Sequence, residues 1–310
     1  MGLIPTDLRF LIKLHKEITF EGPVLTLGNQ DIWATYDELK SFFRQMDCRF
    51  REVEPFKGTS AELVRCLPRA KEFVHAQVFF QMLGIDDYYD VDRFDQDKPK
   101  LLHDLNTPIP RDLCDRFSLV LDGGTIEHVF DIRSVMENIV RALRVGGWVI
   151  HFSPASHYID HGFYSFSPCF FYEFYGINGF EDFRCYLLEI STDFPMGYLK
   201  PCTYMEYTYG APITQFLDES KYILILFAAR KVNSPDLIRV PDQGTYDPGT
   251  KARVQAASSP PVLSNSRSPS LYERRVPKPL QPVLQPLRPY FGKLYSCVFP
   301  IRSRPKKRVL

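Results

Sequence analysis

The stretch FSLVLDGGTIEHVF, residues 117–130, indicates how this chain folds. It opens with an apolar run typical of a strand that is buried on both faces, and it then turns abruptly at Asp122, Gly123 and Gly124. A helical pattern over 131–147 follows, which we expect to stop at Gly146-Gly147, and the next strand is expected over 148–154. A strand, a helix and a second strand in this order favour parallel neighbours joined by a crossover helix.

The same alternation continues on both sides of this stretch. Helical spacing or helix boundary residues predict helices over 5–18 (with Thr6 as N-cap), 35–46, 68–84 and about 165–178, and apolar runs predict strands over 22–28, 88–92, 100–106, 183–190 and 221–231. We therefore predict an α/β fold with a doubly wound, Rossmann-like, mostly parallel sheet. Such sheets bind ligands beyond the carboxyl ends of their strands, which is where Asp122 and Gly123 would lie. The alternative is an ordinary turn after a strand.

Charge divides the chain into two parts. Up to residue 230 there are 23 Lys and Arg against 33 Asp and Glu, whereas from residue 231 onward there are 15 against 4, together with 13 of the 25 prolines. We expect an N-terminal helix (1–22), an α/β domain (23–232) and a basic, Pro- and Ser-rich tail (233–310) that is largely disordered. The tail ends in RSRPKKRVL, and its charge suits an anionic partner or membrane surface; a solvated tail without a partner is the alternative.

The seven cysteines are odd in number and lack CxxC spacing, so they indicate reduced thiols and neither a disulfide framework nor a metal site. The sequence also lacks a run of about 20 apolar residues that could cross a bilayer, and it lacks a signal peptide. We therefore expect a cytoplasmic protein that holds no metal.

The order of the segments resembles that of class I S-adenosylmethionine-dependent methyltransferases. The segment from Ala142 to Phe152, a helix end followed by Gly-Gly and a strand, carries much of the resemblance. More narrowly, HDLNTPIP, DGGTIEHVF and HGFYSFSPCFFYEFY look like a group found among bacterial surface-glycan and secondary-metabolite genes. The resemblance spans roughly residues 23–231 and implies an antiparallel strand in the closing pair.

That resemblance implies S-adenosyl-L-methionine as the cofactor and a small molecule or glycan as the substrate. Its methionine part would lie at the turn after the first strand, where Gly28, Asn29 and Gln30 replace the usual GxGxG motif. The ribose hydroxyls would bind Asp90, with Asp92 as the substitute if the strand register differs. The adenine would meet Asp104 and Leu105, although Asp104 is also placed to make an Asx turn. Residues Asp122 and Gly123 would lie beside the transferred methyl group.

Methyl transfer to a hydroxyl oxygen is helped by a base, and histidine titrates in the right range. His161, in a loop expected to cover the substrate, is our first choice, and His128 is the second; Glu127 would anchor one of them or carry charge at a helix start. Each histidine also has a structural interpretation as a hydrogen-bonding residue.

Two other functions remain open at this stage. A degenerate methyltransferase fold would bind a ligand or partner without catalysis, as the missing glycines suggest. A different nucleotide-dependent enzyme, such as one that uses NAD, is disfavoured because the GxGxxG fingerprint is absent.

Overall fold

The computed structural model describes residues 2–210, 220–258 and 308–309. Its main sheet has the strand order β11-β9-β8-β10-β7-β6-β2-β4-β5. The strands are β2 (Val24–Leu27), β4 (Tyr88–Asp92), β5 (Leu101–Leu102), β6 (Phe117–Gly123), β7 (Leu143–Ser156), β8 (Phe180–Ile190), β9 (Thr203–Glu206), β10 (Tyr222–Lys231) and β11 (Arg308–Val309). A separate pair, β1 (Gly2–Leu3) and β3 (Asp31–Ile32), is parallel.

Strand direction confirms the predicted fold class. Strands β5, β4, β2, β6 and β7 run parallel to one another, and β10 lies antiparallel between β7 and β8. The predicted antiparallel strand of the closing pair is therefore β10.

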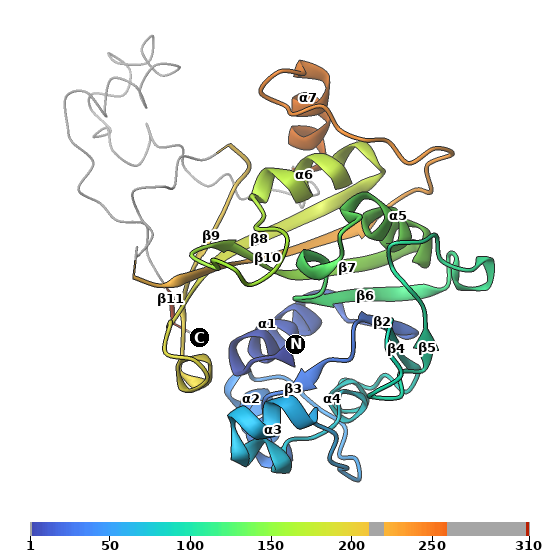
Figure 1. Cartoon of the computed structure of the whole chain (residues 1–310). Coiled ribbons are helices and arrows are strands. Elements are labelled where there is room, and N and C mark those ends of the chain that lie inside the picture. Colours follow the sequence, from blue (N-terminus) through green and yellow to red (C-terminus); the bar gives the residue numbers. More distant parts are fainter. Residues whose placement is uncertain (1, 211–219, 259–307, 310) are drawn as a thin grey trace, which may run out of the picture. The chain divides into compact units, whose positions relative to one another are not determined.

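Helices cover both faces of the sheet (Figure 1). One face packs against α1 (Pro5–Ile18), α2 (Tyr36–Gln45) and α4 (Ala76–Met82), and the other against α5 (Ile132–Ala142) and α6 (Pro168–Ile177). Strand residues alternate between two apolar cores: Leu119 and Leu121 of β6 face the first, and Val120 faces the second. Both faces of the sheet are buried, which explains why the strands are apolar runs and not alternating patterns.

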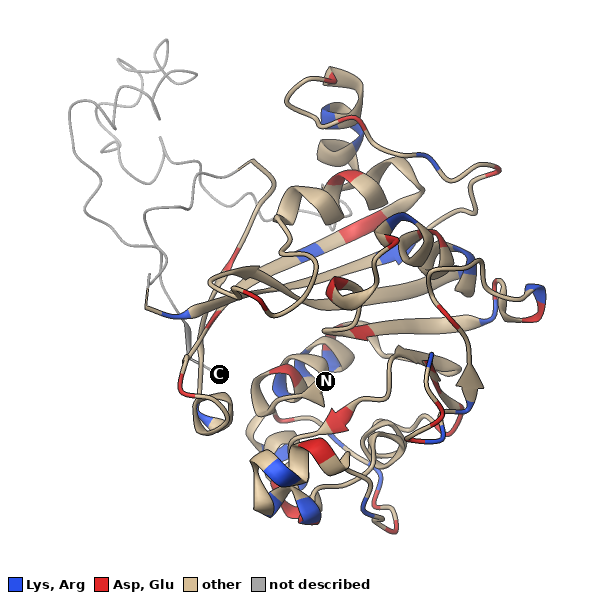
Figure 2. Cartoon of the chain, in the orientation of Figure 1, with Lys and Arg blue, Asp and Glu red and all other residues tan. Residues whose placement is uncertain are grey.

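The described residues also form the short helix α3 (Ala61–Cys66) and four 3₁₀ turns: η1 (Pro68–Glu72), η2 (Arg111–Leu113), η3 (Ile126–His128) and η4 (Met196–Leu199). Charged residues of both signs are spread over helices and loops (Figure 2). No helix among the described residues is long and apolar enough to span a membrane.

Some predicted boundaries were wrong. The single helix expected over 68–84 is two pieces, η1 and α4, because Val74 bridges to Lys57 and His75 caps α4 by accepting from the Gln77 N–H. The first helix has Ile4, not Thr6, as its N-cap, since Asp7 accepts from the Ile4 N–H.

The helix expected over 131–147 also ends early. Its last residue is Ala142, and Gly146-Gly147 belong to β7. The side chain of Lys231, at the end of β10, accounts for this sharp ending. Its Nζ donates to the Val140 and Leu143 carbonyls at 2.8 and 2.6 Å, and to Asp115 at 3.0 Å, so carbonyls that the helix leaves unpaired have a donor.

Residues 233–258, assigned above to the tail, pack against the α/β body. Helix α7 (Pro248–Ala257) buries Val254 against Gly176 of α6. Asn178 exchanges two hydrogen bonds with the backbone of Arg239, at 2.8 and 2.9 Å. The rest of the predicted tail, apart from β11, lies outside the described residues.

Candidate functional site

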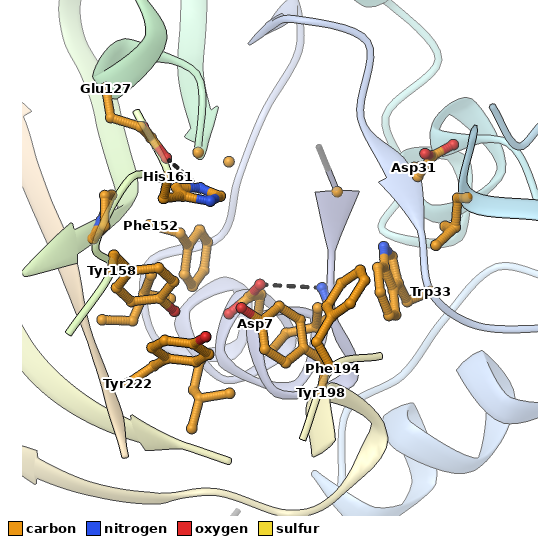
Figure 3. Close-up of a pocket in the computed structure, with 18 of the residues that line it drawn as sticks. Asp7, Asp31, Trp33, Glu127, Phe152, Tyr158, His161, Phe194, Tyr198 and Tyr222 are labelled. Atoms are coloured by element: carbon orange, nitrogen blue, oxygen red, sulfur yellow. Dashed lines mark hydrogen bonds and ion pairs between the residues drawn. The ribbon is translucent and has the colours of Figure 1, made fainter. Parts of the chain in front are cut away.

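A pocket of about 830 Å³ opens near the carboxyl ends of β6 and β7. Gly123 and Gly124, which end and follow β6, line it together with Phe152 and Pro154 of β7. Other parts of its wall come from the N-terminal residues, from the β3–α3 region, from the loop after β7 and from the segment after β8 (Figure 3). The position agrees with the ligand-binding edge expected of a doubly wound sheet.

A carboxylate and two imidazoles meet at this pocket. Glu127 and His128 lie on η3, and His161 lies on the loop after β7. The Glu127 Oε1 atom is 3.7 Å from His161 Nε2 and 4.0 Å from His128 Nε2. The two imidazole ring centroids are 5.1 Å apart. The structure thus brings together both histidines that were predicted as candidate bases.

The loop after β7 is held tightly against η3. The backbone carbonyl of Glu127 accepts from the Phe163 N–H at 2.8 Å, and a Cβ on Gly162 would lie 2.9 Å from the same carbonyl oxygen. Only glycine permits this close approach without a shift of the chain. The Tyr158 ring packs 5.3 Å from the His161 ring. These contacts fix where His161 lies.

Burial sets the protonation of this cluster. The Glu127 side chain is 1% exposed, and burial raises its pKa to about 7, although His161 opposes the rise. Burial lowers the pKa of His128, and the neighbouring His161 lowers it further. The cluster can therefore exchange a proton near neutral pH.

A second buried carboxyl lies elsewhere in the pocket. Asp7 of α1 accepts the Ile4 N–H through Oδ2 at 3.1 Å, and its Oδ1 has no partner among the described residues. Burial raises the pKa of Asp7 to about 8. Asp31 also lines the pocket, and both of its oxygens accept from Ser60, at 2.6 and 2.7 Å.

Aromatic rings form much of the remaining wall. Trp33 packs against Phe194 and Tyr198 at ring distances of 6.2 and 5.9 Å, and Tyr158 stacks on Tyr222 at 4.5 Å (Figure 3). Among the described residues that line the pocket there is no Lys or Arg, whereas five are acidic: Asp7, Asp31, Glu62, Glu127 and Asp160. The lining favours a neutral polyhydroxylated or a cationic ligand over a phosphate.

The residues predicted to bind the cofactor lie mostly outside the pocket. Gly28 has φ of 73°, as a tight turn after β2 requires. The Gln30 side chain is buried and donates from Nε2 to the Leu27 carbonyl at 2.6 Å and to Thr125 Oγ1 at 3.4 Å. A Cβ on Gly123 would lie 2.3 Å from Gln30 Oε1. The Gln30 side chain therefore fills the space beside Gly123 where the transferred methyl group of the cofactor was expected.

The predicted ribose and adenine residues have partners within the protein. Asp90 is buried in the middle of β4 and accepts the Lys100 N–H at 2.9 Å, whereas Asp92 ends the strand and accepts the Asn29 N–H at 3.3 Å. The substitute residue, Asp92, is thus the one beside the Gly28 turn. Asp104 accepts from the N–H and the side chain of Asn106, which is the Asx turn considered above, and Leu105 is buried.

Asp122 is wholly buried and is not among the residues that line the pocket. Its Oδ1 accepts the Thr125 N–H at 2.8 Å, and its Oδ2 lies 2.8 Å from His151 Nδ1. The other ring nitrogen of His151 lies 2.7 Å from the Tyr175 hydroxyl. The three side chains form a buried polar network that shapes the turn after β6.

Of the predicted site residues, the pocket contains Gly123, His128 and His161, together with Glu127, the residue expected to anchor a histidine. Four further residues of the pocket were not predicted from the sequence: Asp7 and the aromatic residues Trp33, Phe194 and Tyr198. One feature of the sequence indicated Asp7: it is a carboxylate among the apolar residues at the start of a predicted helix. No such feature indicated the aromatic residues, since their meeting depends on contacts between distant segments.

Comparisons with known proteins found similarity in solved structures alone. No family model matches the sequence, and no curated protein does. A Thermotoga maritima protein described as an S-adenosylmethionine-dependent methyltransferase, possibly a histamine N-methyltransferase, is 16% identical with a TM-score of 0.35; the match covers 72% of this chain and 89% of that chain. The YcgJ protein of Bacillus subtilis is 14% identical with a TM-score of 0.37, over 73% and 99% of the two chains.

A third similar structure contains a bound product of the cofactor. It is a phosphoethanolamine N-methyltransferase from Haemonchus contortus, solved with S-adenosylhomocysteine, which is 14% identical with a TM-score of 0.35 over 73% and 52% of the two chains. Two of these three proteins are described as methyltransferases.

Proposed function

We propose that this protein is a cytoplasmic S-adenosylmethionine-dependent methyltransferase that acts on a hydroxyl oxygen of a small molecule or glycan. The observation that carries the proposal is the pocket near the carboxyl ends of β6 and β7, where the Gly123-Gly124 backbone meets Glu127, His128 and His161. Such an edge is where doubly wound sheets bind their ligands. All six cysteines within the described residues are free thiols, which agrees with a reducing compartment.

The lining supports a sugar-like or similarly hydroxylated acceptor. Buried carboxyls at Asp7 and Glu127 each keep one oxygen without a partner among the described residues, and such oxygens accept hydrogen bonds from hydroxyl groups. The aromatic group formed by Trp33, Phe194 and Tyr198 offers ring faces against which the apolar face of a sugar can pack. A phosphorylated acceptor is disfavoured by the acidic lining.

The chain's own residues would align the acceptor hydroxyl and take its proton. The cofactor, when bound, supplies the methyl group. His128 has a lowered pKa and is neutral at pH 7, so its free nitrogen can accept a proton; His161, held beside Glu127, is the other base that we propose. Replacing the active base with alanine should lower kcat by roughly 10²–10⁴-fold while the affinity for S-adenosylhomocysteine stays unchanged. If neither His161→Ala nor His128→Ala lowers kcat more than a few-fold, there is no such base.

A specific observation favours a second candidate, a ligand-binding module without methyl transfer. As the residues lie in this structure, the cofactor does not fit beside Gly123, because Gln30 fills that space and is hydrogen-bonded there. Cofactor binding at the Gly28 turn would require the Gln30 side chain to leave. The module would use the same pocket for its ligand.

Titration calorimetry with S-adenosylhomocysteine separates the two candidates. The methyltransferase proposal expects one site per chain, with binding to Gln30→Ala at least as tight as binding to the parent. Asp92→Ala should weaken binding by about 1.5–3 kcal/mol, the range for a hydrogen bond to a charged group, and Asp90→Ala should weaken it less. No binding to either the parent or Gln30→Ala would support the module instead.

A further inference from the structure

We propose that Glu127, His128 and His161 bind one divalent transition-metal ion at the pocket wall. Each side chain offers one ligand atom, and the three atoms lie within 4.8 Å of one another. Figure 3 shows Glu127 directed toward His161. The inference concerns the same pocket as the proposed function, but it does not depend on methyl transfer.

The three groups meet at long ion-pair distances, not at the spacing of a tight hydrogen bond. The carboxylate–imidazole distances of 3.7 and 4.0 Å exceed hydrogen-bond length. The Glu127 Oε2 atom is buried and has no partner among the described residues, although an unpaired buried carboxylate oxygen is costly. A cation held by both carboxylate oxygens at the centre of the three groups would give Oε2 a partner and would explain why a carboxylate is buried beside two imidazoles.

The spacing suits an ion after small movements. Zinc–ligand bonds to histidine nitrogen and carboxylate oxygen are about 2.0–2.2 Å, so ligand atoms on one ion lie about 3–3.5 Å apart. Side-chain shifts of about 1 Å bring the three groups to that spacing. The Phe163 N–H bond to the Glu127 carbonyl and the close approach of Gly162 already hold the two segments together.

The ligand types select the class of metal. Two imidazoles and one carboxylate suit Zn²⁺, Fe²⁺, Co²⁺ or Mn²⁺ better than Mg²⁺ or Ca²⁺, which prefer oxygen ligands. Three protein ligands leave at least one coordination position open, as in catalytic zinc sites. Since all three residues line the pocket, a water or a substrate hydroxyl in the pocket can occupy that position. A metal ion lowers the pKa of such a group and thereby assists removal of its proton. With the ion bound, the two histidines act as its ligands, and this assistance takes the place of the histidine base proposed above.

Titration of the full-length, chelator-treated protein with Zn²⁺ tests the proposal. We expect one Zn²⁺ per chain with a Kd in the micromolar range or below, and a cobalt-substituted protein whose visible absorption reports imidazole ligation. His128→Ala and His161→Ala should each weaken Zn²⁺ binding at least 10-fold. Glu127→Gln, which keeps the shape of the side chain, should weaken binding likewise. His157→Ala is the matched control: it lies in the same loop, but its Nδ1 contacts the Lys221 carbonyl, outside the cluster.

Circular dichroism must show that each variant is folded. The proposal is wrong if the parent takes up no stoichiometric Zn²⁺, or if folded Glu127→Gln and both alanine variants bind as tightly as His157→Ala. The readout is metal occupancy, so it stands apart from the S-adenosylhomocysteine titration. If the protein binds Zn²⁺ but no S-adenosylhomocysteine, the result supports the metal site and contradicts the methyltransferase proposal.

Discussion

At the scale of single residues, the pocket is defined by groups whose burial conflicts with their charge. Asp7 and Glu127 are buried carboxyls, and each has an oxygen that no described residue satisfies. Folded proteins usually pair such atoms. Residues that lack partners within their own chain are expected where a ligand supplies the partner, and both of these face one cavity.

Asp7 makes the stability of the fold depend on pH. Its pKa is about 8 in the folded protein against 3.8 for an unperturbed aspartate, so the folded state holds a proton that the unfolded state releases. The contribution of Asp7 to the free energy of unfolding is therefore greatest below about pH 4, and it falls as the pH rises toward 8. Glu127, whose pKa rises from 4.5 to about 7, acts in the same direction.

We predict that Asp7→Asn flattens this decline. Between pH 5 and pH 8 the melting temperature of the variant should fall at least about 4 °C less than that of the parent, which corresponds to roughly 1–2 kcal/mol. Asp37→Asn, at an exposed position on α2, serves as the control and should keep the parent's profile. Equal pH dependence in Asp7→Asn and the parent would mean that Asp7 is ionised in the folded protein.

At the scale of elements, the sequence predicted strands better than it predicted their surroundings. The runs FSLVLD and WVIHFSP became β6 and β7 because burial on both faces leaves a plain apolar signal. The helix expected over 68–84 failed because Val74 and His75 make contacts that spacing does not reveal. Whether Asp90 or Asp92 would bind the ribose depends on where β4 ends, which the sequence alone does not determine. Among the residues that line the pocket, His128 and His161 were predicted because they follow β6 and β7 closely in the sequence.

The loop after β7 should depend on Gly162. A methyl group there would press on the Glu127 carbonyl at 2.9 Å, and backbone cannot give way cheaply. We expect Gly162→Ala to lower the free energy of unfolding by about 1–3 kcal/mol, as overpacking does. Urea unfolding measures this, with Ser165→Ala, exposed in the same loop, as the control. Equal midpoints for the two variants would show that the loop relaxes freely.

The end of β10 should depend on Lys231. Lys231→Met leaves the Val140 and Leu143 carbonyls without their donor, and each unpaired buried carbonyl costs about 1–3 kcal/mol. We expect a total loss of about 2–4 kcal/mol in denaturant unfolding. Arg230→Met is the matched neighbour: it removes a partly exposed ion pair with Asp182 and should cost less than about 1 kcal/mol. If both variants lose the same free energy of unfolding, the Lys231 hydrogen bonds stabilise the fold no more than the exposed Arg230 ion pair does.

At the scale of the whole molecule, residues beyond 232 make contacts with the folded body. The sequence predicts the end of the folded body at residue 232, because the composition becomes basic and rich in proline there. Residues 233–258 nevertheless bury Val254 and bond to Asn178 and Glu173 of the α6 region. A few apolar and polar contacts with a neighbouring helix can hold a segment in place even where its average composition predicts disorder.

We predict that truncation after Ser258 and truncation after Val232 differ. The shorter chain exposes the face of α6 that α7 covers. Its melting temperature should therefore be at least about 5 °C below that of the chain ending at Ser258, which corresponds to a loss of more than about 1 kcal/mol in the free energy of unfolding. Thermal unfolding of the two purified chains measures the difference. Equal melting temperatures would restore the boundary at residue 232.

The position of β10 between β7 and β8 also governs when the body can form. Both of its neighbours are synthesised earlier, yet neither can reach its final pairing until the last strand of this set inserts between them. A nascent chain that ends before residue 231 therefore carries two long apolar strands with open edges, which is the state most prone to aggregate. On the ribosome, this protein should gain protease resistance in one late step, when β10 emerges, and should rely on chaperones until then.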